Sequence, residues 1–193
     1  MKILNILGSP RKNGNTAKVL DLYEENLRNK GHSVERIRIT DYQINGCLEC
    51  WACTKSNDKP GCVQKDDVQS IFEKMFSSDA IVYASPLIGW DISSQIKSLF
   101  DRHFSIVKGY GTPNHKSFIE NKVISLLITC MGPQENNTDL VEEFFNRFSN
   151  YVNTKQAKKY IVTGSMSPDF PERAKKTAEK MVEDIEHFKT ELY

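Results

Sequence analysis

The sequence lacks any apolar run that is long enough to cross a membrane, and it lacks an excess of either charge. Its 193 residues include 26 lysines and arginines against 25 aspartates and glutamates, which gives a formal net charge of +1. Nucleic-acid-binding proteins carry a basic excess, and solvating tails carry an acidic one. The composition therefore predicts a protein whose partners include neither a nucleic acid nor a membrane.

The sequence also shows no pattern of a signal peptide, an internal repeat, a low-complexity tract or a domain linker. The apolar stretch at the N-terminus is short and leads directly into a polar loop, so we expect a cytoplasmic protein. In that compartment the five cysteines would begin reduced, and clustered cysteines suggest metal or redox chemistry before disulfides. The length suits a single domain over residues 1–193, with a cysteine-rich insertion at about residues 40–66.

What the sequence does contain is a regular alternation of strand and helix patterns. Apolar and alternating runs predict strands at residues 2–7, 32–39, 80–85, 123–129 and 157–163. Amphipathic runs predict helices at residues 15–30, 67–76, 92–104, 138–152 and 171–188, the second of them capped by Asp67. Strands separated by helices require right-handed crossovers and a parallel sheet. We therefore expect a doubly wound α/β fold of the flavodoxin type, with strand order 2-1-3-4-5 and helices on both faces.

Three predicted loops follow the carboxyl ends of strands one, three and four, where an open α/β sheet binds its ligand. The loops cover residues 9–16, 85–90 and 129–132, and each contains a glycine and a hydroxyl side chain. The sequence thus predicts one site that is composed of all three loops.

The first loop joins a buried strand to a helix and is rich in hydroxyl and amide side chains. Five residues separate Gly8 from Gly14, and Asn15 stands where a P-loop requires lysine, so the spacing excludes that motif; the G-x-G-x-x-G fingerprint is absent too. A helix N-terminus with polar loop side chains suits a single phosphate dianion, and a surface turn with a good helix cap is the alternative. The candidate side chains are Ser9, Arg11, Asn13, Asn15 and Thr16.

The second and third loops offer a place for a flat ligand. Proline cannot donate to a strand ladder, and glycine lets the backbone approach a ring closely. The candidate residues are Pro86, Leu87, Ile88, Gly89, Trp90, Thr129 and Gly132. A subunit interface is the alternative for the apolar residues among them. We expect Cys130, in the third loop, to be a small buried residue at a strand end.

The cysteine segment, residues 47–62, contains Cys47, Cys50, Cys53 and Cys62. Two-residue gaps let neighbouring thiolates converge on one centre, and Cys-x2-Cys-x2-Cys is the opening run of a [4Fe–4S] ligand set with a fourth thiolate supplied separately. Zinc is less natural, because structural zinc prefers two separated pairs or added histidine, and this segment has no histidine. Plain thiols, a disulfide and zinc stay open as alternatives to the cluster.

Several of these stretches together resemble a known family. Gly8-Ser-Pro-Arg followed by Gly14-Asn-Thr is similar to the phosphate loop of NAD(P)H-dependent FMN reductases and iron–sulfur flavoproteins, a branch of the flavodoxin-like proteins. The similarity extends through residues 85–102, the cysteine segment and Lys65-Asp-Asp, over roughly residues 1–132. The resemblance implies bound FMN whose ring is lined by the second loop, NADH or NADPH as co-substrate, and a homodimer or homotetramer.

These features predict an FMN-dependent oxidoreductase that takes electrons from NADH or NADPH and reduces a flavin, a quinone or another small acceptor. The flavin performs the redox chemistry in such an enzyme, so we expect no catalytic side chain. Two alternatives stay open: an iron–sulfur flavoprotein that accepts electrons from ferredoxin, and a flavodoxin-like carrier without a substrate pocket, each serving a redox partner protein. We expect the histidines to lie at the surface, with His103 at a solvated helix end and the others at His32, His115 and His187.

Overall fold

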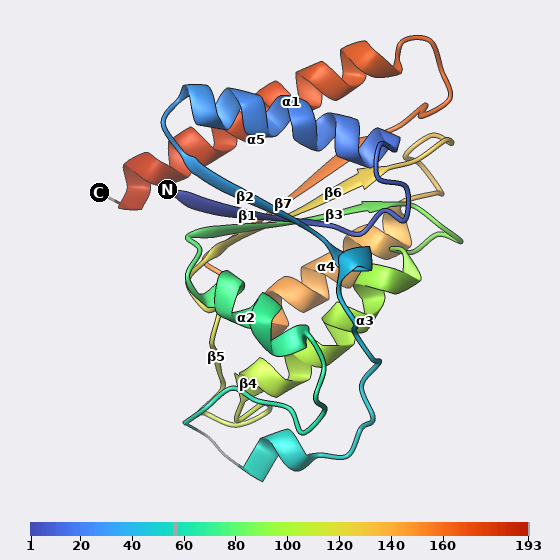
Figure 1. Cartoon of the computed structure of the whole chain (residues 1–193). Coiled ribbons are helices and arrows are strands. Elements are labelled where there is room, and N and C mark those ends of the chain that lie inside the picture. The colour runs from blue at the N-terminus through green and yellow to red at the C-terminus, as the bar shows by residue number, and fades with distance from the viewer. Residues whose placement is uncertain (56–57, 193) are drawn as a thin grey trace.

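Five parallel strands form the central sheet of the computed structural model, which describes residues 1–55 and 58–192 (Figure 1). The strands are β1 (Lys2–Leu7), β2 (Ser33–Arg38), β3 (Ala80–Pro86), β6 (Val123–Thr129) and β7 (Gln156–Val162). They lie in the order β2-β1-β3-β6-β7, and every neighbouring pair is parallel. The predicted order 2-1-3-4-5 of a flavodoxin-like sheet is therefore confirmed, with β6 and β7 as the fourth and fifth strands.

Helices cover both faces of this sheet (Figure 1). They are α1 (Asn15–Asn29), α2 (Val68–Phe76), α3 (Ser94–Arg102), α4 (Asp139–Tyr151) and α5 (Phe170–Leu192). On one face α1 and α5 lie side by side, and Leu20 and Met181 belong to the same apolar core as Val82. The other three helices cover the opposite face, where Phe72 and Phe145 share a core with Tyr83.

The position of each strand in the sheet matches its pattern of apolar residues. β6 is buried along its whole length, as expected of a nearly continuous apolar run that is covered on both faces. β2 lies at an edge of the sheet and alternates between exposed and more buried positions. Since parallel strands end at the same edge of a sheet, the loops after β1, β3 and β6 lie together there.

The structure also contains short elements that the sequence patterns did not predict. They are η1 (Ile39–Asp41), η2 (Ala52–Lys55), η3 (His103–Ile106), β4 (Val107–Lys108) and β5 (Lys116–Ser117). β4 and β5 pair antiparallel, with residues 109–115 between them. η3 takes the last two residues of the helix predicted over residues 92–104, since α3 ends at Arg102. Such elements are too short for a hydrophobic period to develop.

The expectation that the histidines lie at the surface is wrong for two of them. His103 is fully buried: Nδ1 lies 2.8 Å from the Leu99 carbonyl oxygen and Nε2 lies 2.9 Å from the Tyr83 hydroxyl. Burial lowers the pKa of His103 to about 4, so its ring is neutral at neutral pH. His32 is also buried, with Nε2 2.5 Å from a carboxylate oxygen of Glu186. Each ring lies within three residues of a helix end and contacts a side chain that is distant in sequence, and a local pattern does not report such a contact.

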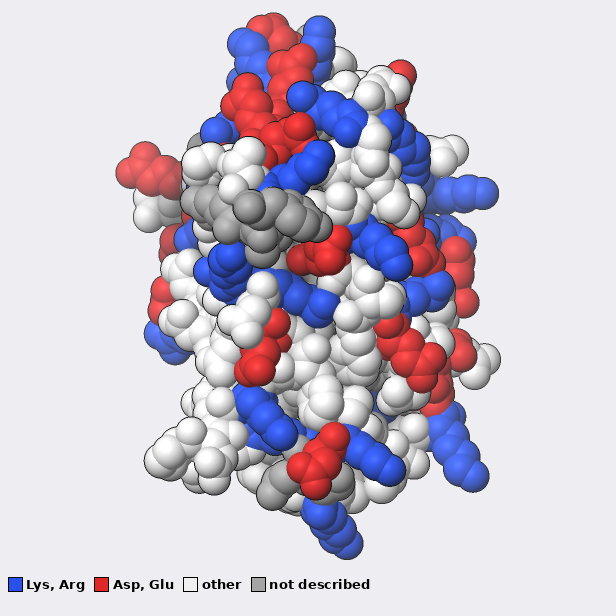
Figure 2. Space-filling model, turned by 90° about the vertical axis from the view of Figure 1, so that its left-hand side faces the viewer, with Lys and Arg blue, Asp and Glu red and all other residues white. Residues whose placement is uncertain are grey.

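Charged side chains of both signs are interspersed on the face at the amino end of β1 (Figure 2). Along α5, for example, Lys176 pairs with Glu172 and Lys180 pairs with Asp184. Among the helices that the structure describes, none is both long enough and apolar enough to cross a bilayer.

Candidate functional site

The first loop is fixed to two neighbouring elements at Gly8, directly after β1. The Gly8 amide donates a 2.7 Å hydrogen bond to the Ala84 carbonyl of β3, and the Gly8 carbonyl accepts one of 2.6 Å from the Ser93 hydroxyl. A Cβ atom on Gly8 would lie 2.8 Å from the Cβ of Ile96, so a side chain does not fit there. The start of the loop is therefore fixed by contacts within the protein.

The N-terminus of α1 lies at the other end of this loop and offers backbone donors. Gly14 is the N-cap, with φ of −72° and ψ of 173°, and no side chain caps the first turn. That turn contains no acidic side chain, in contrast to α4, whose first turn contains Asp139 and Glu142. The first amides of a helix have no partner within the helix, and the helix dipole attracts an anion to them. The end of this 15-residue helix therefore suits a phosphate group.

The predicted side chains of this loop differ in exposure. Arg11 and Asn13 are exposed, whereas Ser9 is buried and its hydroxyl lies 3.3 Å from both the amide and the carbonyl of Arg11. The side-chain amide of Asn15 donates a 2.6 Å hydrogen bond to the Ser165 carbonyl, in the loop after β7. Arg11 and Asn13 are therefore the side chains that face solvent, while Ser9 and Asn15 hold the loop in place.

Two predicted residues, Thr16 and Thr129, contact one another. Their hydroxyl oxygens lie 2.7 Å apart, and both side chains are buried. Each hydroxyl therefore has its partner inside the protein. The pair connects the first turn of α1 to the end of β6 and so holds the first and third loops together.

The second loop is a tight turn that exposes an aromatic side chain. Ile88 and Asp91 exchange backbone hydrogen bonds of 2.9 and 3.2 Å around Gly89 and Trp90, whose φ angles are 58° and 62°. Positive φ at both central residues is the type I′ geometry, which glycine adopts readily and tryptophan rarely. Trp90 is 61% exposed in this turn. The turn thus holds an indole ring at the rim of the site at some cost in backbone strain.

The second and third loops line one pocket of about 290 Å³. The Leu87 amide donates a 2.9 Å hydrogen bond to the Thr129 carbonyl, which holds these two loops together. Cys130 is buried, as predicted, and burial raises the pKa of its thiol. The residues that line the pocket are Leu87, Gly89, Trp90, Cys130, Met131, Gly132 and Asn137. Of the predicted residues in these loops, Pro86, Ile88 and Thr129 lie beside the pocket without lining it.

Two residues at this edge of the sheet, Asn137 and Ser165, were not predicted from the sequence. Asn137 lies before α4, and its side-chain amide donates a 2.7 Å hydrogen bond to the Pro133 carbonyl. Ser165 follows β7, and its backbone amide donates a 2.9 Å hydrogen bond to the Cys130 carbonyl. The predicted strand order places β7 next to β6, so it could have indicated that the loop after β7, with Ser165, lies at this edge of the sheet. No local sequence pattern indicates that Asn137 lies there.

The four clustered cysteines surround a second cavity of about 350 Å³, which we call the thiol pocket. All four are free thiols; Cys47 and Cys50 are exposed, and Cys53 and Cys62 are half-buried. The pocket is completed by Trp51, Arg102 and Phe104, among others. Within residues 1–55 and 58–192, no three His, Cys, Asp or Glu side chains are placed to hold a single metal ion. The structure therefore brings the predicted thiols to one cavity without forming a single-ion site.

A lysine and a strained backbone lie next to the thiols of this pocket. Lys108 of β4 donates a 2.6 Å hydrogen bond from Nζ to the Cys53 carbonyl. Burial raises the pKa of the Cys53 thiol, and the charge of Lys108 opposes this effect only in part. Glu49 and Trp51 have positive φ angles of 52° and 57°, and the Trp51 ring meets Phe104 edge-on at 5.2 Å. Non-glycine residues with positive φ are uncommon and gather at functional sites.

Fold and site together define a flavodoxin-like α/β protein with a three-loop pocket at the carboxyl edge of its sheet and a separate thiol pocket. The chain belongs to the NADPH-dependent FMN reductase family, whose model matches residues 1–169.

Curated relatives with detectable sequence similarity include iron–sulfur flavoproteins of archaea. One from Archaeoglobus fulgidus is 39% identical over 102 residues, which cover 53% of this chain and 45% of the relative. Another, from Methanocaldococcus jannaschii, is 30% identical over 148 residues, which cover 75% of this chain and 72% of the relative. The chain spans about half the length of four of the iron–sulfur flavoproteins that it matches.

Solved structures share the fold over nearly the whole chain. An NAD(P)H:quinone oxidoreductase from Methanothermobacter marburgensis superimposes with a TM-score of 0.77 at 21% identity, covering 97% of this chain and 98% of the other. An FMN-dependent NADH-azoreductase from Bacillus anthracis, in complex with FMN, gives a TM-score of 0.69 at 16% identity, covering 95% and 98%. At these identities the likeness establishes the fold alone.

Proposed function

We propose that this protein binds FMN at the carboxyl edge of its sheet and takes electrons from NADH or NADPH to reduce a flavin, a quinone or another small acceptor. The observation that carries the proposal is the uncapped first turn of α1, which Thr16 and Thr129 join to the loops of the 290 Å³ pocket. Membership of the FMN reductase family supports the same function. So does the fold shared with a quinone oxidoreductase and with an azoreductase that contains FMN.

Each loop has a separate task in this proposal. The first amides of α1, with the exposed Arg11 and Asn13, would bind the phosphate, whose charge suits both a helix dipole and a guanidinium. The backbone at Gly89 and Gly132 would line the ring, with Trp90 at its rim. FMN supplies the hydride and electron chemistry when bound, while the protein binds it, orients it and controls access to it.

Binding of FMN to the apoprotein, followed by quenching of flavin fluorescence, tests the phosphate site. The double variant Asn15→Ala with Thr16→Ala loses both side-chain contacts that hold the first turn of α1. Each such hydrogen bond is worth roughly 1 kcal/mol, so we expect affinity to fall about tenfold or more. The control Asn29→Ala changes the far end of the same helix and should bind as the wild type does. Undiminished binding by the double variant would refute the assignment.

Steady-state oxidation of NADH and NADPH, with a quinone as acceptor, separates an enzyme from a carrier. Saturable kinetics with either nucleotide support the reductase. A protein that retains FMN but turns over neither nucleotide would instead be a carrier, or would take its electrons from a protein.

A second candidate function is that of an iron–sulfur flavoprotein that accepts electrons from ferredoxin. It is favoured by the four thiols around one cavity, because four thiolates are the ligand set of a [4Fe–4S] cluster. The two curated relatives described above carry the name iron–sulfur flavoprotein. The residues that would hold the cluster are Cys47, Cys50, Cys53 and Cys62. A bound cluster would supply one-electron transfer.

Anaerobic purification with iron and sulfide analysis tests this candidate, and a visible spectrum reports flavin and cluster together. Cys50→Ser should lose the cluster, whereas Cys130→Ser changes a buried thiol outside the thiol pocket and should keep it. Absence of iron and sulfide from the wild type would exclude the cluster and leave the FMN proposal intact.

We also propose a homodimer or homotetramer that covers the rim of the flavin pocket. Ile88, Trp90 and Met131 are large apolar side chains at this rim, and each is more than half exposed. Exposed apolar side chains that lie together mark interaction sites. Size-exclusion chromatography with light scattering should give twice or four times the 22.1 kDa chain mass, and a monomer at micromolar concentration would contradict the proposal.

A further inference from the structure

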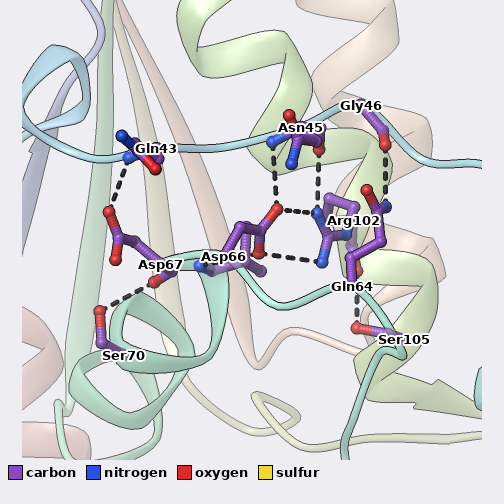
Figure 3. Close-up of polar contacts among 10 residues, drawn as sticks. Gln43, Asn45, Gly46, Gln64, Asp66, Asp67, Ser70, Arg102 and Ser105 are labelled. Carbon is purple, nitrogen blue, oxygen red and sulfur yellow. Dashed lines mark hydrogen bonds and ion pairs between the residues drawn. The ribbon is translucent and has the colours of Figure 1, made fainter.

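Arg102, the last residue of α3, is a buried cation in the wall of the thiol pocket. Its Nη1 atom donates hydrogen bonds of 2.9 Å to the Asn45 carbonyl and 2.6 Å to Oδ2 of Asp66, and its Nη2 atom donates one of 3.2 Å to Oδ1 of Asp66 (Figure 3). Both side chains of this ion pair are almost wholly removed from solvent. The pair is therefore part of the protein interior rather than a surface contact.

These contacts join the two ends of the cysteine segment. Asn45 precedes Cys47 by two residues, and Asp66 follows Cys62 by four. The same Asp66 carboxylate accepts a 3.1 Å hydrogen bond from the Asn45 amide, so carbonyl and amide of one residue are both bound (Figure 3). Gln64 adds a 3.0 Å hydrogen bond to the Gly46 carbonyl. One guanidinium thus closes the base of the segment that carries all four thiols.

The third nitrogen of the guanidinium has no such contact. Nε of Arg102 is buried and has no hydrogen-bond partner among the described residues. An unpartnered buried donor on a charged group is costly, and native proteins rarely keep one without a reason. Cys62 lines the same pocket. Its half-buried thiol therefore offers a sulfur acceptor in the cavity that Arg102 also lines.

The helix that carries Arg102 also begins at the flavin pocket. Ser93, its N-cap, bonds through its hydroxyl to the Gly8 carbonyl and through its amide to the Ser85 hydroxyl. Nine residues of α-helix span roughly 14 Å. α3 is therefore a short rigid connection with one end at the first two loops and the other end at the thiol pocket.

Building on the second proposed function, we propose that Arg102 is the positioning residue of the thiol pocket: it closes the base of the cysteine segment with Nη1 and Nη2 and donates through Nε to the sulfur at Cys62. Hydrogen bonds to the sulfurs and the net charge around an iron–sulfur cluster set its reduction potential. Arg102 would then control the potential of the centre as well as the shape of its cavity.

Anaerobic reconstitution with iron and sulfide tests the proposal in the wild type, Arg102→Lys, Asp66→Asn and the control Arg147→Lys, an exposed arginine of α4 that pairs with Glu143. The readout is the midpoint potential from a redox titration followed by electron paramagnetic resonance. A merely structural role would change the yield of loaded protein and leave the potential unmoved.

Arg102→Lys removes the Nε donor and should lower the potential enough to change the ratio of oxidised to reduced centres about tenfold, which is 59 mV for one electron. Asp66→Asn leaves the guanidinium charge uncompensated and should move the potential in the opposite direction. If Arg102→Lys does not fold, the midpoint potential of Asp66→Asn tests the proposal. The potential of Arg147→Lys should equal that of the wild type. An unchanged potential in the variants of the buried pair overturns the proposal.

If the wild type takes up no iron and sulfide, the cluster function fails by itself, and the apoprotein then decides the role of Arg102. Alkylation by iodoacetamide at one pH, resolved by mass spectrometry, reports each thiol. Without the Nε donor, Cys62 alone should react more slowly in Arg102→Lys, by about threefold. Faster reaction of all four thiols would mean that the residue only holds the segment closed, and that result, or no change, overturns the proposal.

Discussion

The two candidate sites of this protein differ in what holds them together. The loop after β1 is fixed by contacts that belong to the interior: Gly8 bonds to β3 and α3, and Thr16 bonds to Thr129. The described part of the cysteine segment contains the short helix η2 and two exposed thiols, and the base of the segment is closed chiefly by Arg102 and Asp66.

This difference has a consequence for ligand binding. The first loop is organised by the same packing that builds the sheet, so little reorganisation would be needed for an anion to bind there. A group held by four thiolates would instead add its binding energy to the stability of the segment around it, as structural metals do. The three-loop pocket is thus already formed by the fold, whereas a ligand of the thiol pocket would add to the order of the segment around it.

The largest effect is expected from Arg102→Ala, which removes the closure of the cysteine segment. Breaking a buried ion pair by truncating one partner typically costs 3–5 kcal/mol, because the other charge stays buried, so we expect a loss of about 3–5 kcal/mol in the free energy of unfolding. Urea unfolding followed by circular dichroism measures it. The exposed control Arg147→Ala should change stability by less than about 0.5 kcal/mol. A loss below about 1 kcal/mol at Arg102 would mean that the segment does not depend on this pair.

A smaller loss is expected from Gly8→Ala, at the start of the first loop. The added Cβ would lie 2.8 Å from the Cβ of Ile96, and overpacking of this kind costs about 1–3 kcal/mol. FMN affinity should fall with it, since the loop must move. The matched control is Gly46→Ala, where a Cβ would meet nothing within 4 Å. Equal stability of both variants would contradict the view that packing fixes this loop.

Thr16→Val should lower the free energy of unfolding by about 1–3 kcal/mol or less, because it leaves the buried Thr129 hydroxyl without a partner. The double variant Thr16→Val with Thr129→Val removes both hydroxyls, and its loss should be smaller than the sum of the single losses. Thermal unfolding of the four proteins in this cycle gives the coupling. Additive losses would show that the two hydroxyls do not depend on each other.

The smallest effect is a pH dependence at the base of the cysteine segment. Burial raises the pKa of Asp66, but hydrogen bonds from Arg102 and from the Asn45 and Val68 amides lower it by more. The pKa of Asp66 therefore lies below its usual value of 3.8. A carboxyl with a depressed pKa stabilises the fold above pH 3.8, and this contribution is lost as the pH falls through the folded pKa. The stability difference between wild type and Asp66→Asn should therefore shrink below about pH 3.8. A difference that stays constant down to pH 2 would contradict this.

Much of the fold and part of the site could be predicted from local patterns. The strand at β6 and the helix at α1 follow directly from apolar runs and helical periodicity, and the strand order follows from right-handed crossovers. The convergence of the three loops also follows, because Thr16, Leu87 and Thr129 all lie at the carboxyl edge of the sheet.

Other details depended on contacts between distant segments. Asp67 is the N-cap residue of α2, as predicted, yet its carboxylate accepts a 2.7 Å hydrogen bond from the Gln43 amide, and Asp66 instead accepts from the Val68 amide at 3.3 Å. His103 is predicted at a solvated end and is instead enclosed beside Tyr83. Asp67 and His103 each bind a residue that is distant in sequence, Gln43 and Tyr83 respectively, so local patterns could not predict these contacts.

By itself, the sequence determined the strand order, the hydroxyl- and amide-rich composition of the first loop and the clustering of four cysteines, because these follow from periodicity, spacing and residue type. Only the tertiary structure decided that the first turn of α1 has no side-chain cap, that Ser165 joins the site, and that a guanidinium from α3 closes the cysteine segment. The physical reason is that Arg102 and Asp66, 36 residues apart, meet only once α3 has packed against the sheet.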